Sequence, residues 1–356
     1  MDSKPACLDF ALVGHQDNWD KIHRFTNSLR TRKDVPALAL EDVKNVYPFI
    51  PPRELFHIEI RSANGQQRRG VYIETFISPD ELDATHLRSN IKKVKEACAY
   101  AASLNIPVVS LGGFTSILLE SDNTDNTRIN NTFFTTGNTL TAAFIADAIE
   151  KVCMQKSMVL AACSMLIIGA TGDIGTACAR YFSPKLKELL ICARRPVPLQ
   201  KMAEQYALQL PVKWSVNINE LLPQVDIIIC VASSMLVDCD TKRIPAGAII
   251  CDAGYPKNID PVVGGNHNIF WGGMGVARQG FSFTPDLRNE LYSFPLPNIV
   301  HGCLVEAIIL SMQNRHEAYS KGRGNITVEA MREILGYAAL HGIETAPFFN
   351  ASFYRN

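Results

Sequence analysis

The first third of the chain alternates short apolar runs with polar turns, a pattern that predicts strands mixed with helices. The turn at residues 63–65, Ala-Asn-Gly, separates two apolar runs and predicts a hairpin. Apolar side chains at helical spacing predict a helix over 91–104, after a helix start near 78–81, and the polar stretch 121–131 predicts a solvated loop. The predicted strands are residues 10–13, 56–60, 71–76 and 108–111.

In the second half, apolar strands alternate regularly with helices, after a long helical stretch over 141–154. Regular alternation of this kind predicts a parallel sheet with helices on both faces. Beyond residue 297 the pattern predicts helices, over 299–319 and 327–341. The predicted strands are residues 165–168, 188–193, 212–216, 226–231 and 248–251, and two of the helices between them are 173–182 and 199–208.

These patterns predict an α/β protein with three parts, and 356 residues allow this at ~150 residues per domain. An N-terminal α/β domain, expected to bind the substrate, covers residues 1–150. A doubly wound parallel sheet covers 151–296, and C-terminal helices cover 297–356. The first boundary is expected near residues 140–160, within the connecting helix.

The 35 basic side chains balance 35 acidic ones, so the formal net charge is zero. Without a basic block, neither nucleic acid nor an anionic membrane surface is expected as the main partner. The most apolar run, 157–170, is too short to cross a membrane, and residues 1–11 lack the pattern of a signal peptide. The ten cysteines form no CxxC pair and no zinc-type spacing, which indicates reduced thiols in the cytoplasm and no metal site.

A predicted strand at 165–168 runs directly into a glycine-rich turn and then a helix. Glycines in a GxxGxxG pattern permit a tight turn, close approach of a pyrophosphate and close packing of the helix on the strand, while the helix N-terminus supplies free N–H groups. The motif predicts a Rossmann dinucleotide site, and the alternative is a strand-to-helix turn without a ligand. The residues expected at this site are Gly169, Thr171, Gly172, Asp173, Ile174 and Gly175.

The strand after this motif ends in two arginines, where an NAD-preferring site usually has an acidic residue. Arg194 and Arg195 match the 2'-phosphate of NADPH through paired hydrogen bonds, so NADPH is the expected cofactor. The alternative is a solvated arginine pair. Ala232 and Ser233 close a further strand at the same sheet edge and are expected to border the nicotinamide ribose.

Cys303 differs from the other cysteines, several of which lie in or beside apolar strands and are expected to be small buried hydrophobes. It lies at the start of a predicted helix, where the helix dipole is expected to lower the thiol pKa and favour a nucleophilic thiolate. His301 is a candidate acid or base partner. The alternatives are a packed helix cysteine and a packed or solvated histidine.

A thiolate beside a nicotinamide suggests a specific reaction. The cysteine attacks an acyl thioester to form an acyl-enzyme, which hydride from NADPH reduces to an aldehyde. The covalent step keeps the acyl group bound beside the hydride donor.

Five stretches together resemble the cyanobacterial long-chain acyl-[acyl-carrier-protein] reductases: 111–116 (LGGFTS), 134–139 (FTTGNT), 169–175 (GATGDIG), 252–258 (DAGYPKN) and 322–328 (GRGNITV). The resemblance runs from about residue 12 to residue 341. Enzymes of that family reduce fatty acyl thioesters with NADPH to fatty aldehydes through an acylated cysteine. That cysteine lies in a stretch that 301–306 (HGCLVE) matches, so the resemblance implies that Cys303 is the nucleophile.

The resemblance also implies that residues 254–258 border the active site, with Tyr255 or Lys257 polarising the thioester carbonyl or protonating the oxyanion. The alternative is a strand-to-loop turn built on Gly and Pro, with a solvated lysine. Gly254 borders this site, and Gly273 is expected near the nicotinamide. Glu74 is a further candidate, the alternative being a solvated strand carboxylate. A turn from the first domain is expected to face the cleft and to admit the thioester or acyl chain, with the residues Gly112, Gly113, Phe114, Thr115 and Ser116.

The expected substrate is a fatty acyl chain on acyl carrier protein or on coenzyme A, and an aldehyde-consuming enzyme is a candidate partner. The competing enzyme class is a shikimate-type or amino-acid-type dehydrogenase, which transfers hydride without a covalent intermediate. The non-enzyme alternative is a sensor in which NADPH switches a partner-binding surface. An acidic carrier protein would fit a basic face formed by Arg68, Arg69, Lys92, Lys93 and Lys95. The alternative is that these residues are ordinary solvated charges.

Overall fold

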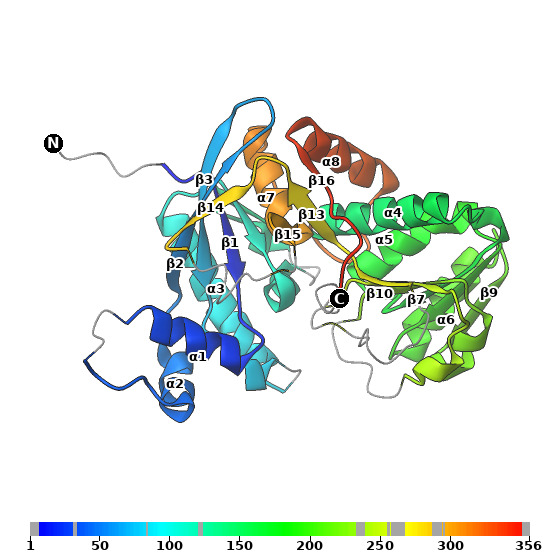
Figure 1. Ribbon diagram of the computed structural model, residues 1–356, viewed down its shortest axis with the longest axis horizontal. Coiled ribbons are helices and arrows are strands. Elements are labelled where there is room, and N and C mark those ends of the chain that lie inside the picture. The colour runs from blue at the N-terminus through cyan, green and yellow to red at the C-terminus, as the bar shows by residue number, and fades with distance from the viewer. Residues whose placement is uncertain are drawn as a thin grey trace.

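The computed structural model describes residues 7–30, 34–82, 85–119, 124–232, 239–254, 257, 268–286, 294 and 296–350. Within these residues two large sheets lie side by side, each covered by helices, and a small third sheet lies between them (Figure 1). The α/β class predicted from the sequence is confirmed.

The first sheet has seven strands in the order β14-β2-β3-β1-β4-β6-β5. Its centre is parallel, because β1 pairs in parallel with both β3 and β4, and the antiparallel pairing of β2 with β3 confirms the predicted hairpin. Strand β14 arrives from the second half of the chain and pairs with β2. The strands are β1 (Phe10–Gly14), β2 (Arg53–Arg61), β3 (Gln67–Glu74), β4 (Val108–Leu111), β5 (Arg128–Ile129), β6 (Thr132–Thr135) and β14 (Phe281–Thr284).

Side chains of the first sheet alternate between two helical layers, as the period of two in a strand requires. Val13 of β1 packs in the cluster with α3, whereas Leu12 packs in the cluster with α7 on the opposite face. Two further helices lie at the carboxyl end of β1 (Figure 1). The helices are α1 (Trp19–Ser28), α2 (Leu40–Val46), α3 (Leu87–Ser103) and α7 (Gly302–Met312).

The second sheet has six strands in the order β12-β11-β10-β7-β8-β9, and all of its pairings are parallel. Numbered from its first strand this is the order 6-5-4-1-2-3, which is the doubly wound Rossmann arrangement. The predicted fold of this part is confirmed. Its elements are β7 (Ser164–Ile168), α5 (Asp173–Phe182), β8 (Glu188–Cys192), α6 (Pro196–Tyr206), β9 (Val212–Ser215), β10 (Ile227–Cys230), β11 (Ile249–Asp252) and β12 (Asn268–Trp271).

The C-terminal part departs from the prediction of a helix over 299–319, which is wrong at both ends. Residues 299–301 form strand β15, because β-branched Ile299 and Val300 pair antiparallel with β13. Helix α7 ends at Met312, and Asn314 has a left-handed φ of 53°. The third sheet has the order β15-β13-β16, with β13 (Met274–Ala277), β15 (Ile299–His301) and β16 (Ile343–Thr345), and α8 (Val328–Leu340) precedes β16.

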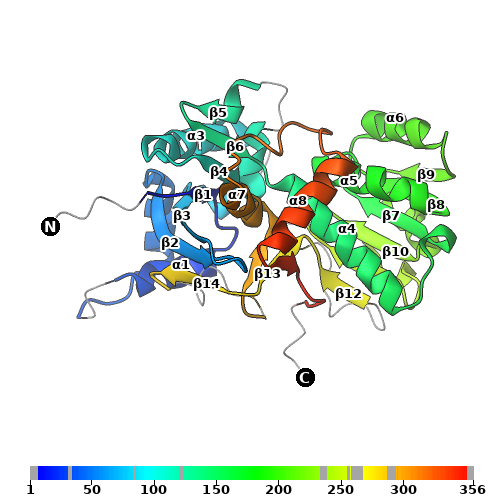
Figure 2. The ribbon, with the colours of Figure 1, turned by 90° about the horizontal axis from the view of Figure 1, so that it is seen from above.

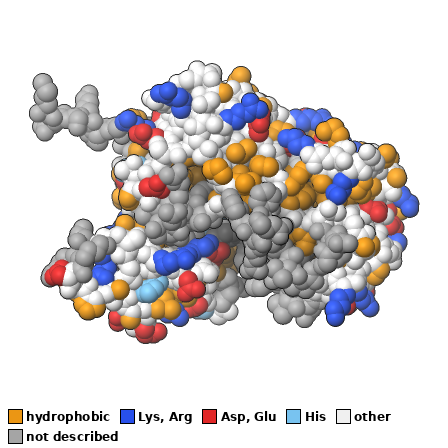
Figure 3. Space-filling model, viewed as in Figure 1, with side chains coloured by type: hydrophobic (Ala, Val, Ile, Leu, Met, Phe, Trp, Pro, Cys, Tyr) orange, Lys and Arg blue, Asp and Glu red, His pale blue; other side chains and the backbone are white. Residues whose placement is uncertain are grey.

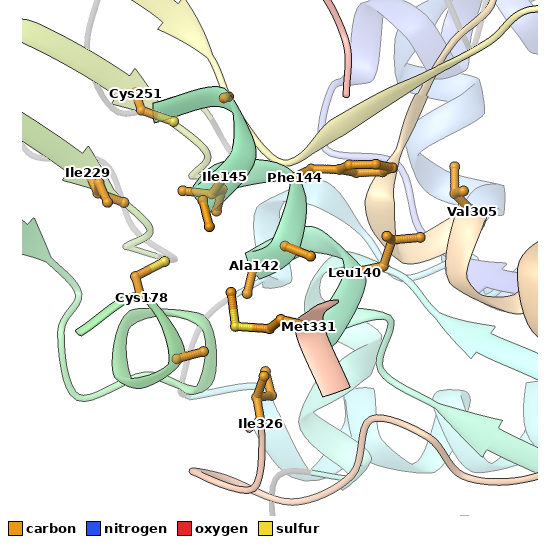
Figure 4. Packing of buried hydrophobic residues seen from close by; sticks show 14 of the residues in the cluster. Leu140, Ala142, Phe144, Ile145, Cys178, Ile229, Cys251, Val305, Ile326 and Met331 are labelled. Atoms are coloured by element: carbon orange, nitrogen blue, oxygen red, sulfur yellow. The ribbon is translucent and has the colours of Figure 1, made fainter. Parts of the chain in front are cut away.

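Helix α4 (Asn138–Gln155) joins the two large sheets and is buried on most of its surface. Figure 4 shows Phe144 directed toward Val305 of α7, whereas Ile145 lies on the side of Cys251 in the second sheet. A helix that is apolar all round must be covered on several sides, and Figure 2 shows α4 between α8 and the second sheet. In the described part of the chain, no helix is both long enough and apolar enough to cross a membrane.

Candidate active site

Cys303 is the second residue of α7 and lies against the first sheet. The Ser110 hydroxyl of β4 donates to the Cys303 carbonyl oxygen. Gly112, directly after β4, faces the thiol, since a Cβ at this residue would lie 3.5 Å from Cys303 Sγ. Gly137 approaches the backbone more closely, because a Cβ there would lie 2.2 Å from Cys303 Cα. Small residues of two sequence motifs therefore surround the cysteine.

Burial raises the pKa of the Cys303 thiol to about 11, and the expectation of a lowered pKa is wrong. The backbone N–H groups of Leu304 and Gly113 lower the pKa, but by less than the loss of solvation raises it. The Glu306 carboxylate raises the pKa further. A nucleophilic Cys303 therefore needs a neighbouring group that takes its proton.

Glu306 lies one turn after Cys303 and is fully buried. Its carboxylate accepts hydrogen bonds from the Thr135 hydroxyl, from the Ser320 hydroxyl at 2.7 Å and from the Leu140 N–H at 3.0 Å. Burial raises the pKa of Glu306. These partners belong to β6, to the loop before α8 and to α4. The carboxylate therefore links α7, the helix that carries Cys303, to these three segments.

The glycine-rich turn has the shape that a dinucleotide pyrophosphate requires. Gly169 has a left-handed φ of 84°, and a Cβ there would lie 2.9 Å from the Ala232 nitrogen. A Cβ at Gly175 would lie 2.3 Å from the Gly169 carbonyl oxygen, so only glycine permits this packing of α5 on β7. Gly172 is the N-cap of α5, where free N–H groups face the turn. These residues fit a bound dinucleotide.

Arg194 and Arg195 follow β8 and are exposed beside this turn. The N–H of Gly169 donates to the Cys192 carbonyl oxygen at 2.9 Å, which places the end of β8 next to the turn. The second predicted ribose contact, Ser233, lies outside the described residues. Arg194 and Arg195 therefore follow a strand end that lies next to the glycine-rich turn.

Lys257 lies on the second sheet near His301, whereas Tyr255 lies outside the described residues. Lys257 Nζ donates to the Asp252 carbonyl oxygen at 3.1 Å, and burial lowers its pKa. Burial, followed by the nearby Lys257 charge, lowers the pKa of His301 to about 3. The imidazole therefore stays neutral at physiological pH, where it is too weak a base to hold a proton but can accept a hydrogen bond.

Gly273 connects the second sheet to the residue before Cys303. Its carbonyl oxygen accepts a hydrogen bond from the Gly302 N–H at 2.9 Å, one residue before Cys303. Gly273 has a left-handed φ of 73°, and Gly302 is packed so closely that a Cβ would lie 2.8 Å from Thr141 Oγ1. Gly273, the residue expected near the nicotinamide, is thus hydrogen-bonded to the start of α7. Gly254 follows β11, and its N–H donates to Asp252 Oδ1 at 3.0 Å.

The chain is similar to a curated protein over most of its length. It is 30% identical over 305 residues to the long-chain acyl-[acyl-carrier-protein] reductase of Synechococcus elongatus, covering 83% of this chain and 87% of that protein. The chain belongs to the long-chain acyl-[acyl-carrier-protein] reductase family. Residues 151–272 of this reductase also match the family described as shikimate / quinate 5-dehydrogenase. The reductase is an NADPH-dependent oxidoreductase.

Other relatives of the reductase share less. Aminotransferase PigE of Serratia sp. is 24% identical over 315 residues, which cover 85% of this chain and 35% of that protein. The nucleotide-binding domain of glutamyl-tRNA reductase from Thermoplasma volcanium is 22% identical, covers 36% of this chain and 84% of that chain, and has a TM-score of 0.27. The iminosuccinate reductase of Paracoccus denitrificans is 22% identical, covers 35% of this chain and 38% of that chain, and has a TM-score of 0.28.

Asp173 of the reductase is predicted to contact the cofactor, but its carboxylate is buried among protein donors. One oxygen accepts from Asn138 Nδ2 at 3.0 Å and the other from the Gly324 N–H at 3.1 Å. Asp173 thus links the dinucleotide turn to α4 and to the loop before α8. Thr171 and Ile174 are half-buried in the same turn.

The turn 112–116 of the reductase, which is predicted to admit the substrate, is anchored by His15, a residue that was not predicted from the sequence. The N–H of Phe114 donates to His15 Nε2 at 3.0 Å, and burial lowers the pKa of His15. Thr115 is fully buried, and its hydroxyl donates to the Val13 carbonyl oxygen at 3.0 Å, whereas Ser116 is 9% exposed. Position directly after a parallel strand is the signal that could have identified His15.

Glu74 of the reductase has no exposed surface, so the alternative of a solvated carboxylate is wrong. Gln16 Nε2 donates to it at 3.1 Å and the Tyr72 hydroxyl at 3.1 Å, and neither of these residues was predicted from the sequence. Burial raises the pKa of Glu74 to about 7. Within the described residues, no group of three or more His, Cys, Asp and Glu side chains could hold a metal ion.

Three side chains of the predicted basic face have protein partners. Arg68 donates to the Ser311 carbonyl oxygen at 3.1 Å, and Arg69 pairs with Glu59 at 2.9 Å. Lys93 donates to two backbone carbonyl oxygens. Figure 3 shows the Lys and Arg side chains of its face dispersed among acidic ones.

Proposed function

We propose that this reductase converts a long-chain fatty acyl thioester into a fatty aldehyde through a covalent acyl-Cys303 intermediate. One observation carries the proposal: Cys303 lies between the two large sheets and is linked to both. Gly112 of the first sheet faces its thiol, and Gly273, after the last strand of the second sheet, is bonded to the residue before it. An acyl group on Cys303 is therefore held beside the dinucleotide domain, where bound NADPH supplies hydride.

Residues around Cys303 have separate roles in this proposal. Gly112 and Gly113 leave room for the thioester, and the turn continues through Phe114, Thr115 and Ser116. Lys257, with Tyr255, polarises the acyl carbonyl, because a buried ammonium or phenol stabilises a developing oxyanion. His301, which stays neutral, accepts a hydrogen bond near the same carbonyl.

The first domain, residues 1–150, binds the acyl chain, and residues 151–296, apart from β14 in the first sheet, bind NADPH. Residues 169–175 hold the pyrophosphate on the N-terminus of α5, and Arg194 and Arg195 pair with the 2'-phosphate. Ala232, Ser233, Gly254 and Gly273 line the nicotinamide side. All ten cysteines are free thiols, which suits the cytoplasm.

The proposed carrier of the fatty acyl group is acyl carrier protein, and coenzyme A is the second carrier to test. The similarity to a long-chain acyl-[acyl-carrier-protein] reductase supports this order. Because a long-chain aldehyde is both apolar and reactive, an aldehyde-consuming enzyme is a candidate partner.

Intact-protein mass spectrometry tests the covalent step. The protein is mixed with palmitoyl- or stearoyl-thioesters of both carriers, with NADPH withheld. We expect a mass gain equal to the acyl group, mapped to Cys303 and lost as aldehyde forms when NADPH is added. Cys303→Ser should abolish adduct and aldehyde, while Cys239→Ser, a half-exposed control, should not. NADPH oxidation without an adduct would favour the dehydrogenase mechanism instead.

A further inference from the structure

Two glycines, Gly14 and Gly112, lie side by side on neighbouring strands of the first sheet, near Cys303. Gly14 of β1 pairs with Glu74 of β3, and on the other side of β1 the Gly112 N–H donates to the Val13 carbonyl oxygen at 2.9 Å. Neighbouring strands lie ~4.8 Å apart, so Gly14 and Gly112 are adjacent. The period of two places Glu74 and these glycines on the α7 face of the sheet, with Leu12.

Two reactive groups lie above these two glycines. A Cβ at Gly112 would lie 3.5 Å from Cys303 Sγ, and a Cβ at Gly14 would lie 2.7 Å from the Tyr72 hydroxyl oxygen. The absence of side chains at both positions thus leaves the thiol and the phenol over neighbouring strands. Any larger residue at Gly14 would displace the phenol.

The Tyr72 hydroxyl is held in a buried hydrogen-bond chain. It donates to Glu74 Oε2 at 3.1 Å, and Gln16 Nε2 donates to Tyr72 at 3.0 Å and to Glu74 at 3.1 Å. The Phe76 N–H donates to the other carboxylate oxygen at 3.2 Å. Stacking of Tyr72 on Phe56, with ring centroids 4.9 Å apart, fixes the ring.

We propose that Tyr72 is a further catalytic residue, which carries the thiol proton of Cys303 during acylation, with Glu74 as the positioning residue that stores it. The proposal rests on the proposed acyl-Cys303 intermediate. Cys303 requires such a group, because its buried thiol is protonated at physiological pH. A hydroxyl backed by a carboxylate can accept and return a proton without moving.

The acylation step balances without any other reactant. The proton leaves Cys303 Sγ for the Tyr72 oxygen as the Tyr72 proton passes to Glu74, while the bond from Sγ to the acyl carbon forms. The bond from the acyl carbon to the carrier sulfur then breaks, and the proton returns from Glu74 through Tyr72 to the departing thiolate. No electron is transferred in this step.

Of the other buried groups near Cys303, His301 has a pKa of about 3 and is too weak a base to take the thiol proton, and two more are already engaged in hydrogen bonds. His15 Nε2 accepts from the Phe114 N–H, and Nδ1 lies 3.3 Å from the Gln16 carbonyl oxygen. Glu306 accepts from partners on three segments, as described above. The groups that face Glu74 are Gln16, Tyr72, Tyr47 and Lys93, and its ordinary pKa is raised by burial into the range where it can exchange a proton at physiological pH.

Tyr72→Phe tests the proposal, since it keeps the ring on Phe56 and removes only the hydroxyl. Tyr100→Phe is the matched control, because the Tyr100 hydroxyl donates to Glu54 at 3.3 Å elsewhere in the first domain. Acylation of Cys303 by palmitoyl-acyl carrier protein is followed by rapid-quench mass spectrometry from pH 6 to 9. We expect Tyr72→Phe to slow acylation about 100-fold, and Glu74→Gln to remove an inflection near pH 7.

Alkylation of Cys303 by iodoacetamide is measured in parallel. It distinguishes a failure of the proposed role of Tyr72 from a failure of the proposed acyl-Cys303 intermediate. Slower alkylation of Tyr72→Phe at pH 7, with Tyr100→Phe like wild type, supports the proton path even if no acyl adduct forms. Absence of any wild-type adduct counts against the proposed function alone. Equal alkylation and acylation rates in Tyr72→Phe and wild type would overturn the role of Tyr72.

Discussion

Gly137 packs against Cys303 so closely that a Cβ at residue 137 would lie 2.2 Å from Cys303 Cα. Gly137 is also the N-cap of α4 and has a left-handed φ of 71°. The helix that joins the two large sheets therefore begins in contact with the residue proposed as nucleophile. A side chain at this one position would change both the stability of the fold and the site.

Gly137→Ala should lower the free energy of unfolding by about 3 kcal/mol and reduce NADPH oxidation at least tenfold. Both the left-handed φ and the overlap with Cys303 contribute. Gly65→Ala separates them, because Gly65 has a φ of 87° and a Cβ there would meet no atom within 4 Å, so it should cost only about 1 kcal/mol. Urea unfolding curves compare the two, and equal losses would contradict the overlap.

Removing the Glu306 side chain should destabilise the protein strongly. Glu306→Ala leaves the donors of Thr135, Ser320 and Leu140 unpaired in a buried site, at a cost of about 3 kcal/mol. Glu306→Gln keeps the shape and one acceptor, so its loss should be smaller. Thermal unfolding ranks the variants, and the prediction fails if Glu306→Ala unfolds like wild type.

Glu74 should make stability depend on pH. Its pKa is raised by burial from 4.5 to about 7, so the folded state binds the proton more tightly than the unfolded state. The stabilisation is complete below pH 4.5 and is lost as the pH rises through 7, amounting to about 3 kcal/mol. Glu74→Gln should flatten unfolding free energies between pH 5 and 8, whereas exposed Glu59→Gln should leave the slope unchanged.

The arginine pair should set the preference for NADPH over NADH. Replacing Arg194 and Arg195 together with alanine removes charge-assisted hydrogen bonds to the 2'-phosphate, and should raise KM for NADPH about 10- to 100-fold with little effect on NADH. Arg243→Ala is the control, because Arg243 pairs with Asp240 in the same domain. Parallel rises for both cofactors would show that the arginines do not read the 2'-phosphate.

Asp173→Asn should separate cofactor affinity from activity. The substitution removes a negative charge beside the pyrophosphate, so the Kd for NADPH should stay equal or fall, while weakening of the links to Asn138 and Gly324 should lower kcat several-fold. Glu150→Gln is the control, since Glu150 bonds Lys185 at the other end of α4 at 2.6 Å. NADPH fluorescence titration gives Kd, and weaker binding would indicate direct contact.

Structural elements that depend on neighbouring residues in the chain could be predicted correctly from the sequence. The hairpin around 63–65, the helix near 141–154 and the alternating elements of the second sheet follow from local periodicity and turn residues. The helix predicted over 299–319 failed because pairing of β15 with β13 outweighs local helical preference. The glycine-rich turn at 169–175 could be recognised because the backbone conformation that it requires depends on local residues.

The sequence by itself determined the α/β class, the dinucleotide turn and the position of Cys303 at a helix start, because these depend on residues within one or two turns of each other. Only the tertiary structure decided the surroundings of Cys303. Gly112 and Gly137 reach it from more than 160 positions away, and the burial they impose reverses the expected direction of its pKa shift. The same folding places β3, which carries Tyr72 and Glu74, beside β1, and β1 beside β4, since sheet pairing joins segments that no sequence spacing connects.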